Sequence, residues 1–194
     1  MRKDNADTRL TSGAKPLLRA DLSGNASAAR FASNRKLTGP GAFYQVVEAG
    51  FDRHAPTEPL TNGLEIYREL LGKTNEAVTQ THLGEPVHIR LHVRSLQRQP
   101  ITNVAIVDLL PGGFEVIDSS ARTGVSAIKG VDYVDVREDR AIFFVTAPTS
   151  ALEIDYQIKS CNRGEFTVPP VFAQSMYDRN FKGRGLGGKI TVTE

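Results

Sequence analysis

A strict alternation of apolar and polar residues between positions 87 and 94 is the strongest constraint on the fold. Aliphatic side chains occupy every second position, and basic or imidazole side chains occupy the positions between them. Val87, Ile89, Leu91 and Val93 alternate with His88, Arg90, His92 and Arg94. A period of two places all the apolar side chains on one face of a strand, whereas a helix would need spacings of three and four. This segment is therefore predicted to be a strand with one buried face and one cationic, solvated face.

Other short segments after residue 60 show the same character. Residues 152–158 alternate strictly, and residues 133–137 and 141–145 flank a charged turn, which predicts a hairpin. Further β-prone runs are 104–110, 114–117, 165–168 and 189–193. Residues 64–71 fit a helix or a strand by propensity. Turns of Gly, Pro and Asn separate the runs, and no long helical period alternates with them. The prediction is an all-β fold, an antiparallel β-sandwich of about seven strands.

The first part of the chain has a different composition. Residues 1–54 carry nine Lys and Arg against five Asp and Glu, a net charge of +4, while the remainder carries −2. Pro56 and Pro59 then mark an extended linker. We therefore expect residues 1–54 to be a flexible basic segment and residues 55–194 to be the sandwich domain. The basic residues are scattered and lack interleaved aromatics, so nucleic-acid binding is not expected.

The sequence also bears on location. It contains no apolar stretch of the ~18–20 residues that a membrane span needs, so direct membrane insertion is not expected. The N-terminus lacks the apolar core of a signal peptide, so none is expected in this chain. Its one cysteine, Cys161, cannot form an intramolecular disulfide.

Three motifs suggest chemistry, but each lacks the context that the chemistry needs. Residues 183–188 match G-x-G-x-x-G, yet only six residues follow, and they have the pattern of a strand rather than of a helix. His88 and His92 would lie ~13 Å apart along a strand, too far to share one metal ion. Cys161 has no neighbouring base. The chain is therefore predicted not to be an enzyme and to use no cofactor or metal.

The stretch from 168 to 178 is unusual for a plain sandwich. Pro169 and Pro170 interrupt an apolar run, and Met176 and Tyr177 precede a polar loop. Large apolar side chains in such a loop either fold back onto the core or form a contact surface. Residue pattern alone leaves core packing and partner contact equally open.

Several segments, in order, resemble the C-terminal end of bacterial α2-macroglobulins, and the resemblance covers roughly residues 43–194. The segments that carry it are YQVVEAGFD (44–52), DLLPGGFE (108–115), YVDVREDR (133–140), FTVPP (166–170), MYD (176–178) and GKITV (188–192). The resemblance implies a macroglobulin-like, fibronectin-like β-sandwich at 55–194. It also implies that residues 1–54 include a remnant of the preceding β domain.

The resemblance further implies a role. Members of this family are envelope protease traps, in which a thioester domain captures the attacking protease covalently. The last macroglobulin-like domain packs on the thioester domain and shields the bond. By resemblance, Met176 and Tyr177, with Pro169 and Pro170, would form this contact. The expected partners are the thioester domain, neighbouring domains of the parent protein and, indirectly, a target protease.

This chain departs from the whole family, because it has no Cys-Leu-Glu-Gln-type thioester motif and no bait region. Cys161 is followed by Asn162 and Arg163. We therefore expect a C-terminal fragment or split-off domain that would not trap a protease alone. A periplasmic or cell-envelope location is implied only by the resemblance. The alternative is a free-standing sandwich that binds another envelope protein through a sheet edge or the 169–178 loop.

Overall fold

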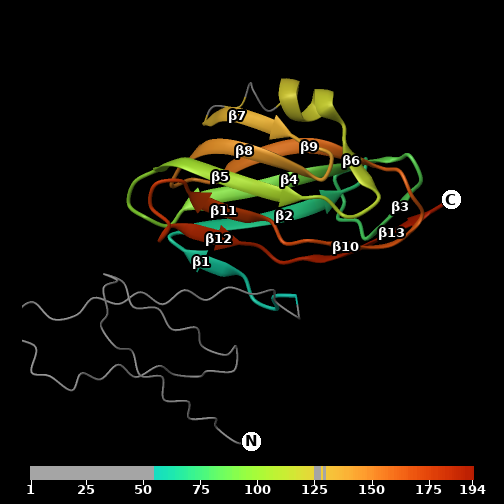
Figure 1. Cartoon of the computed structure of the whole chain (residues 1–194), viewed down its shortest axis with the longest axis horizontal. Coiled ribbons are helices and arrows are strands. Elements are labelled where there is room, and N and C mark those ends of the chain that lie inside the picture. Colours follow the sequence, from blue (N-terminus) through green and yellow to red (C-terminus); the bar gives the residue numbers. More distant parts are fainter. Residues whose placement is uncertain (1–54, 125–127, 129) are drawn as a thin grey trace, which may run out of the picture. The chain divides into compact units, whose positions relative to one another are not determined.

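The computed structural model describes residues 55–124, 128 and 130–194. The flexible segment predicted at 1–54 lies outside the described residues. Within them, the strands form sheets of six, four and three strands. All pairs of strands are antiparallel except one, and the structure is an antiparallel β-sandwich, as predicted. Figure 1 shows the elements in place.

The six-stranded sheet has the order β1-β12-β11-β5-β8-β7. Its strands are β1 (Leu60–Asn62), β12 (Lys182–Arg184), β11 (Phe172–Ser175), β5 (Ile101–Leu109), β8 (Arg140–Ala147) and β7 (Val131–Val136). The predicted hairpin is confirmed as β7 and β8.

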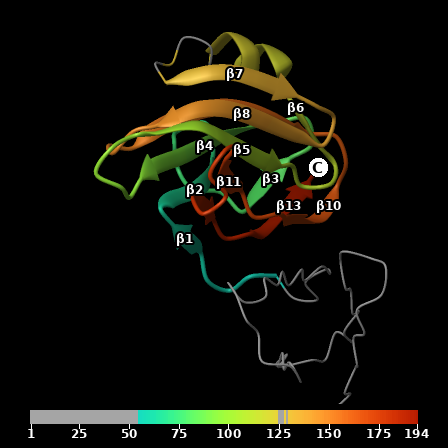
Figure 2. The same ribbon diagram turned by 60° about the vertical axis from the view of Figure 1, so that its left-hand side comes forward.

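The four-stranded sheet has the order β2-β4-β9-β6 and forms the second layer (Figure 2). Its strands are β2 (Leu64–Leu71), β4 (Pro86–Ser95), β9 (Leu152–Ser160) and β6 (Phe114–Val116). The small sheet consists of β10 (Gly164–Val168), β13 (Gly188–Thr193) and β3 (Gln80–His82), with β3 parallel to β13. A short π-helical turn, η1 (Ser120–Gly124), follows β6.

The core lies between the two larger sheets and follows the alternation of their strands. In β4 the predicted apolar face is buried throughout, and β9 contributes Ile154, Tyr156 and Ile158 from the same sheet. Phe143 of β8 packs from the opposite sheet, with its ring centroid 5.4 Å from that of Tyr156. The inward register predicted for residues 87–94 and 152–158 is therefore confirmed. The ambiguous segment 64–71 is a strand, because it pairs with β4 along its whole length.

A buried ionic network joins the two larger sheets. Arg68 of β2 forms an ion pair with Asp108 of β5, and both side chains are almost fully buried. The hydroxyl of Tyr156 in β9 donates to Asp108 Oδ2 at 2.7 Å. Burial raises the pKa of Asp108, and Arg68 opposes this shift. The network gives the inner faces a specific polar connection as well as apolar packing.

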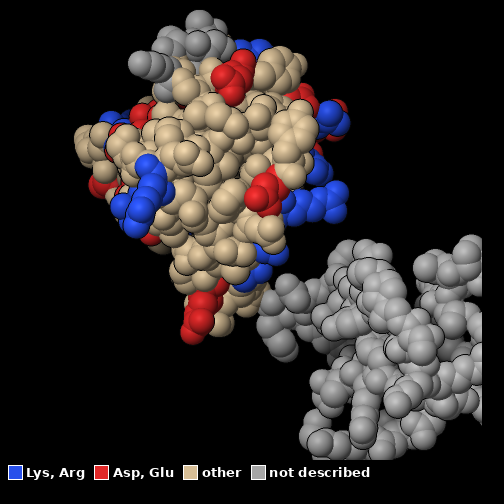
Figure 3. Space-filling view, turned by 90° about the vertical axis from the view of Figure 1, so that its left-hand side faces the viewer, with Lys and Arg blue, Asp and Glu red and all other residues tan. Residues whose placement is uncertain are grey.

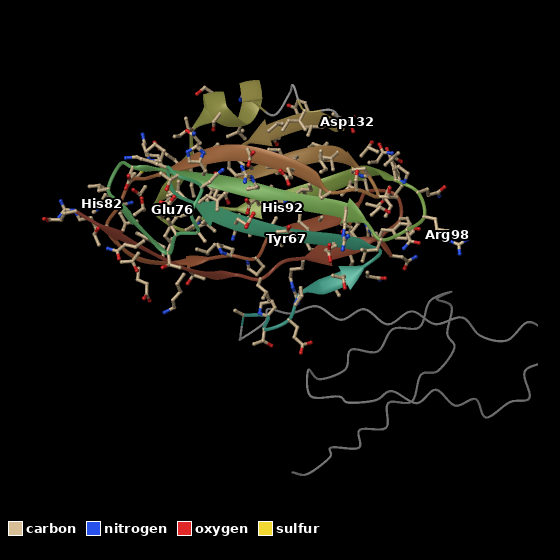
Figure 4. All side chains as sticks on the ribbon, turned by 180° about the vertical axis from the view of Figure 1, so that it is seen from behind. Tyr67, Glu76, His82, His92, Arg98 and Asp132 are labelled. Atoms are coloured by element: carbon tan, nitrogen blue, oxygen red, sulfur yellow. The ribbon has the colours of Figure 1, made fainter. Side chains whose placement is uncertain are left out.

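The outer face of β4 carries basic and imidazole side chains, as predicted, but the outer face of the whole sheet is not cationic. Register places acidic residues of β2 and β9 beside the basic residues of β4. Arg90 Nε lies 2.8 Å from Asp155 Oδ1, and His92 Nε2 lies 2.7 Å from Glu69 Oε2. The Tyr67 ring stacks on His92, with ring centroids 4.3 Å apart. Figure 4 shows Tyr67 and His92 together on this outer face, which therefore carries mixed, paired charges.

The glycine-rich motif at 183–188 is part of the sheet rather than only a turn. Gly183 lies in β12, and a Cβ built there would stand 2.8 Å from the backbone oxygen of Leu64. The absence of a side chain at Gly183 allows β12 to pack closely against β2. This packing accounts for a glycine at position 183 without a role in nucleotide binding.

We expect Gly183→Ala to lower the free energy of unfolding by about 1–3 kcal/mol, because the backbone of β2 must move to admit the methyl group. Gly188→Ala is the matched control, since a Cβ there meets no atom within 4 Å. Chemical denaturation of both variants measures the difference. Equal stability of the two variants would contradict the close-packing explanation.

Candidate interaction site at one end of the sandwich

Two loops meet at one end of the sandwich. Residues 96–100 connect β4 to β5, and residues 176–181 connect β11 to β12. Between them lies a groove of about 540 Å³. Its lining is formed by Gln97, Arg98, Gln99, Pro100, Ile101, Thr102, Asn103, Ser175, Tyr177, Asp178 and Phe181. Figure 3 looks at this end of the molecule, where most of the visible surface is uncharged.

An irregularity in β5 holds the second loop in place. The pairing of β5 with β8 shifts register between Ile101 and Val104, and Asn103 has a φ of 55°. The carbonyl of Asn103 accepts a hydrogen bond of 2.8 Å from the backbone N–H of Met176. Bulges of this kind bend a strand and redirect neighbouring groups, often beside functional sites. The bulge therefore fixes the point at which the chain leaves the sheet and enters the Met176–Tyr177 segment.

The loop also has hydrogen bonds of its own. The backbone N–H of Ser175 donates to the Phe181 carbonyl at 2.9 Å, and that of Phe181 donates to the Asp178 carbonyl at 3.0 Å. The Asp178 carboxylate accepts from the backbone N–H of Asn180 at 3.0 Å. These bonds hold both ends of the loop together, so Met176 and Tyr177 project from a defined turn.

Met176 and Tyr177 are strongly exposed: 51% of Met176 and 82% of Tyr177 is accessible. Leu96, at the start of the neighbouring loop, is 45% exposed. Tyr and Met are enriched where proteins contact partners, because they supply a large contact area and, in Tyr, a hydroxyl group. Core packing and partner contact, the two alternatives left open for residues 168–178, thus apply to different parts of this segment. Val171 and Ala173 belong to the core, whereas Met176 and Tyr177 lie on the surface.

The structure does not bring all four predicted site residues together. Pro169 and Pro170 precede β11, and Met176 and Tyr177 follow it, so five residues of nearly extended chain place Met176 ~20 Å from Pro170. The carbonyl of Pro169 accepts a hydrogen bond from the buried guanidinium of Arg68. Pro169 thus anchors the start of β11 and does not line the groove.

The expected loop over 168–178 is also wrong in part, because residues Phe172–Ser175 form β11 near the middle of the six-stranded sheet. Four residues are too few to show a clear period. Only pairing with β5 and β12 makes this segment a strand. This pairing is what carries Met176 to the end of the sandwich.

Sequence reasoning missed the loop at 96–100 as part of the site. Gln97, Arg98 and Gln99 are polar residues before a proline, a pattern typical of any surface turn. They line the groove only because the connection from β4 to β5 lies beside the connection from β11 to β12 in space. Figure 4 shows Arg98 at this end of the molecule, and Glu76 and His82 at the other.

The described residues offer little for catalysis. Partial desolvation and the Glu115 carboxylate raise the pKa of the exposed Cys161 thiol, which disfavours the reactive thiolate. Across the described ranges, no group of three or more His, Cys, Asp or Glu side chains is arranged to hold a metal ion. The same part of the chain contains no helix long and apolar enough to cross a membrane. Chemically, the groove and its exposed aromatic and thioether groups are suited to binding.

Comparison with known proteins identifies the family. Residues 63–180 match the model described as the bacterial alpha-2-macroglobulin MG10 domain, which is more than half of the chain. The chain belongs to this family. The MG10 match includes β2 through β11, the loop at 96–100 and all of the loop at 176–181 except Phe181.

Curated relatives agree with this MG10 assignment. An alpha-2-macroglobulin homolog of Yersinia pestis is 38% identical over 199 aligned residues, covering 90% of this chain and 10% of that protein. The alpha-2-macroglobulin of Rickettsia conorii is 30% identical, covering 78% of this chain and 8% of the relative. This MG10 chain therefore spans about a tenth of the length of the curated relatives it matches.

Solved structures support the fold of the MG10 chain. The native conformation of E. coli alpha-2-macroglobulin matches with a TM-score of 0.67 at 21% identity, over 75% of this chain and 10% of that one. Salmonella alpha-2-macroglobulin reacted with methylamine matches with a TM-score of 0.66 at 23% identity, over the same fractions. The expected macroglobulin-like β-sandwich is therefore confirmed as the fold class.

Proposed function

We propose that this chain is the C-terminal macroglobulin-like domain of a bacterial α2-macroglobulin, and that it packs on the thioester domain in the resting state. In that role, Met176 and Tyr177 contact the thioester region and exclude water from it. The domain performs no catalysis and acts by binding. Its partners are domains of the same parent protein, and the location is the periplasm or cell envelope.

The exposure of Met176 and Tyr177 on a hydrogen-bonded loop carries this proposal. An exposed aromatic ring on an ordered turn loses little conformational entropy when a partner covers it. A thioester hydrolyses when water reaches it, and an aromatic ring beside a thioether provides a dry surface. The polar groove next to Tyr177 supplies amide and hydroxyl groups from Gln97, Gln99 and Thr102 for the rim of such a contact. Pro169 contributes indirectly, by fixing the start of β11.

Binding of this chain to the remainder of its parent protein, thioester domain included, tests the proposal. We expect calorimetry to show micromolar or tighter binding, and the double variant Met176→Ala/Tyr177→Ala to weaken it by about 2 kcal/mol or more. The two side chains are largely exposed, so the variant should keep the stability of the parent chain.

A matched control removes an aromatic and an aliphatic side chain elsewhere. Tyr67 and Leu186 are 47% and 49% exposed, away from the groove, so Tyr67→Ala/Leu186→Ala should bind like the unaltered chain. Binding that is equally strong in the site variant would place the contact elsewhere. Complete absence of binding would favour a free-standing sandwich that recognises another envelope protein.

A further inference from the structure

The outer face of the six-stranded sheet does not follow the pattern of a solvated face. In an antiparallel sheet with one face in water, apolar residues point inward and polar residues outward. In β5, Val104 and Ile106 point inward and are fully buried, but the residues between and after them are also apolar. In β8, Phe143 is fully buried, and its neighbour Phe144 points to the other face.

Register aligns these outward residues into a continuous apolar surface. One row crosses three strands, with Phe172 of β11 beside Val107 of β5 and Val107 beside Ile142 of β8. In the next row Ala105 lies beside Phe144, which contacts the ring of Tyr133 at a centroid distance of 5.9 Å. We call this surface the outer apolar face: Ala105, Val107, Tyr133, Ile142, Phe144 and Phe172. All six are at least partly accessible, and Tyr133 is 61% exposed.

The four-stranded sheet provides an internal comparison. Its outer face carries the cross-strand pairs Arg90–Asp155, Arg94–Glu65 and His92–Glu69. Such charged pairs are what we expect on a face that contacts solvent. The apolar outer face of the six-stranded sheet is therefore expected to contact another protein surface instead of solvent.

Cationic groups at one margin of the outer apolar face lack counter-charges. Lys182 and Arg184 of β12 point to this face, because Gly183 between them faces the core. Within the part of the chain that the structure describes, neither has an ion pair, and Arg184 Nε is buried without a hydrogen-bond partner. A buried guanidinium nitrogen without a partner is costly. The Arg184 side chain as a whole is partly accessible, so a carboxylate on another surface can pair with the exposed part of this cation.

We propose that the outer apolar face is a second docking surface, which another domain of the same α2-macroglobulin chain covers with an apolar patch and at least one carboxylate placed over Arg184. This proposal rests on the proposed function, because it requires a larger parent chain. The length of the relatives supports an intramolecular occupant, since about nine-tenths of each lies outside the region matched here. The face also continues into the groove, because β11 and β12 lead directly into the loop at 176–181.

Site-specific photo-cross-linking in the full-length parent protein tests this surface. Phe172→p-benzoylphenylalanine places the probe on the outer apolar face, and Tyr67→p-benzoylphenylalanine places it on the charged outer face as an aromatic-for-aromatic control. Tyr177→p-benzoylphenylalanine reports separately on the proposed contact with the thioester domain. We expect position 172 to form an intramolecular cross-link to another domain and position 67 to form none. Adding Arg184→Glu to the Phe172 probe should abolish that cross-link, because the facing carboxylate is then repelled.

The outcomes separate the two proposals. A cross-link at 177 without one at 172 overturns the docking surface and leaves the proposed function intact. A cross-link at 172 without one at 177 overturns the thioester contact and supports the docking surface. Cross-links from 172 to a second copy of the protein, detected as a covalent dimer, would overturn the intramolecular occupant. Unchanged thermal unfolding of the 194-residue chain carrying each probe confirms that the substitutions leave the sandwich folded.

Discussion

Asp108→Ala is expected to lower the free energy of unfolding by about 3–5 kcal/mol, because it leaves the guanidinium of Arg68 buried without its counter-charge. Both side chains of the pair are almost fully buried, so water cannot replace the missing carboxylate. The variant also removes the acceptor of the Tyr156 hydroxyl. Urea denaturation followed by circular dichroism measures the loss.

The matched control replaces the whole network by apolar groups. The triple variant Arg68→Met/Asp108→Leu/Tyr156→Phe removes both charges of this network, and replacing complete buried ion pairs in this way is often neutral or stabilising. We expect this variant to recover most of the stability lost by Asp108→Ala. The recovery is not complete, because the carbonyls of Leu109 and Pro169 lose the hydrogen bonds that Arg68 donates to them. A loss for the triple variant as large as for Asp108→Ala would show that the ion pair itself stabilises the sandwich.

Phe143→Ala is expected to cost about 3–5 kcal/mol, since it opens a cavity in the middle of the core. Phe143 is fully buried and packs on Tyr156 of the opposite sheet. Its neighbour Phe144 points to the outer apolar face and is only partly buried, so Phe144→Ala should cost less, about 1–2 kcal/mol in the isolated chain.

This pair of variants tests the register of β8 directly. The two substitutions remove the same atoms from adjacent positions, so propensity and side-chain size are matched. Comparing denaturation midpoints at constant m-value gives the difference in stability. Equal losses, or a larger loss for Phe144→Ala, would contradict the inward register of Phe143 and the exposure of the outer apolar face together.

Periodicity was sufficient for most of the fold. Residues 87–94 and 152–158 have one apolar and one polar face, so only one strand orientation buries the apolar set. The charged turn at 138–140 likewise predicted the β7–β8 hairpin. The short strands β1, β3, β11 and β12 were not predicted, because three or four residues show no period and become strands only when a partner pairs with them.

The candidate site shows the same division. Met176 and Tyr177 were visible in the sequence as large side chains before a polar loop. The prediction grouped them with Pro169 and Pro170 because the four residues are close in sequence. In the structure β11 runs between the two pairs, so they lie at opposite ends of that strand. Gln97 and Arg98, eighty residues or so away in the chain, line the groove instead.

What the sequence alone determined is the set of long strands and the face that each buries, because the free energy of burying alternate apolar side chains depends on local spacing. Only the tertiary structure decided which side chains meet across strands and sheets. It neutralised the basic residues of β4 with acids from β2 and β9, and it joined Arg68 to Asp108 forty residues along the chain. Pairings of this kind depend on strand order and register, and local pattern carries no information about either.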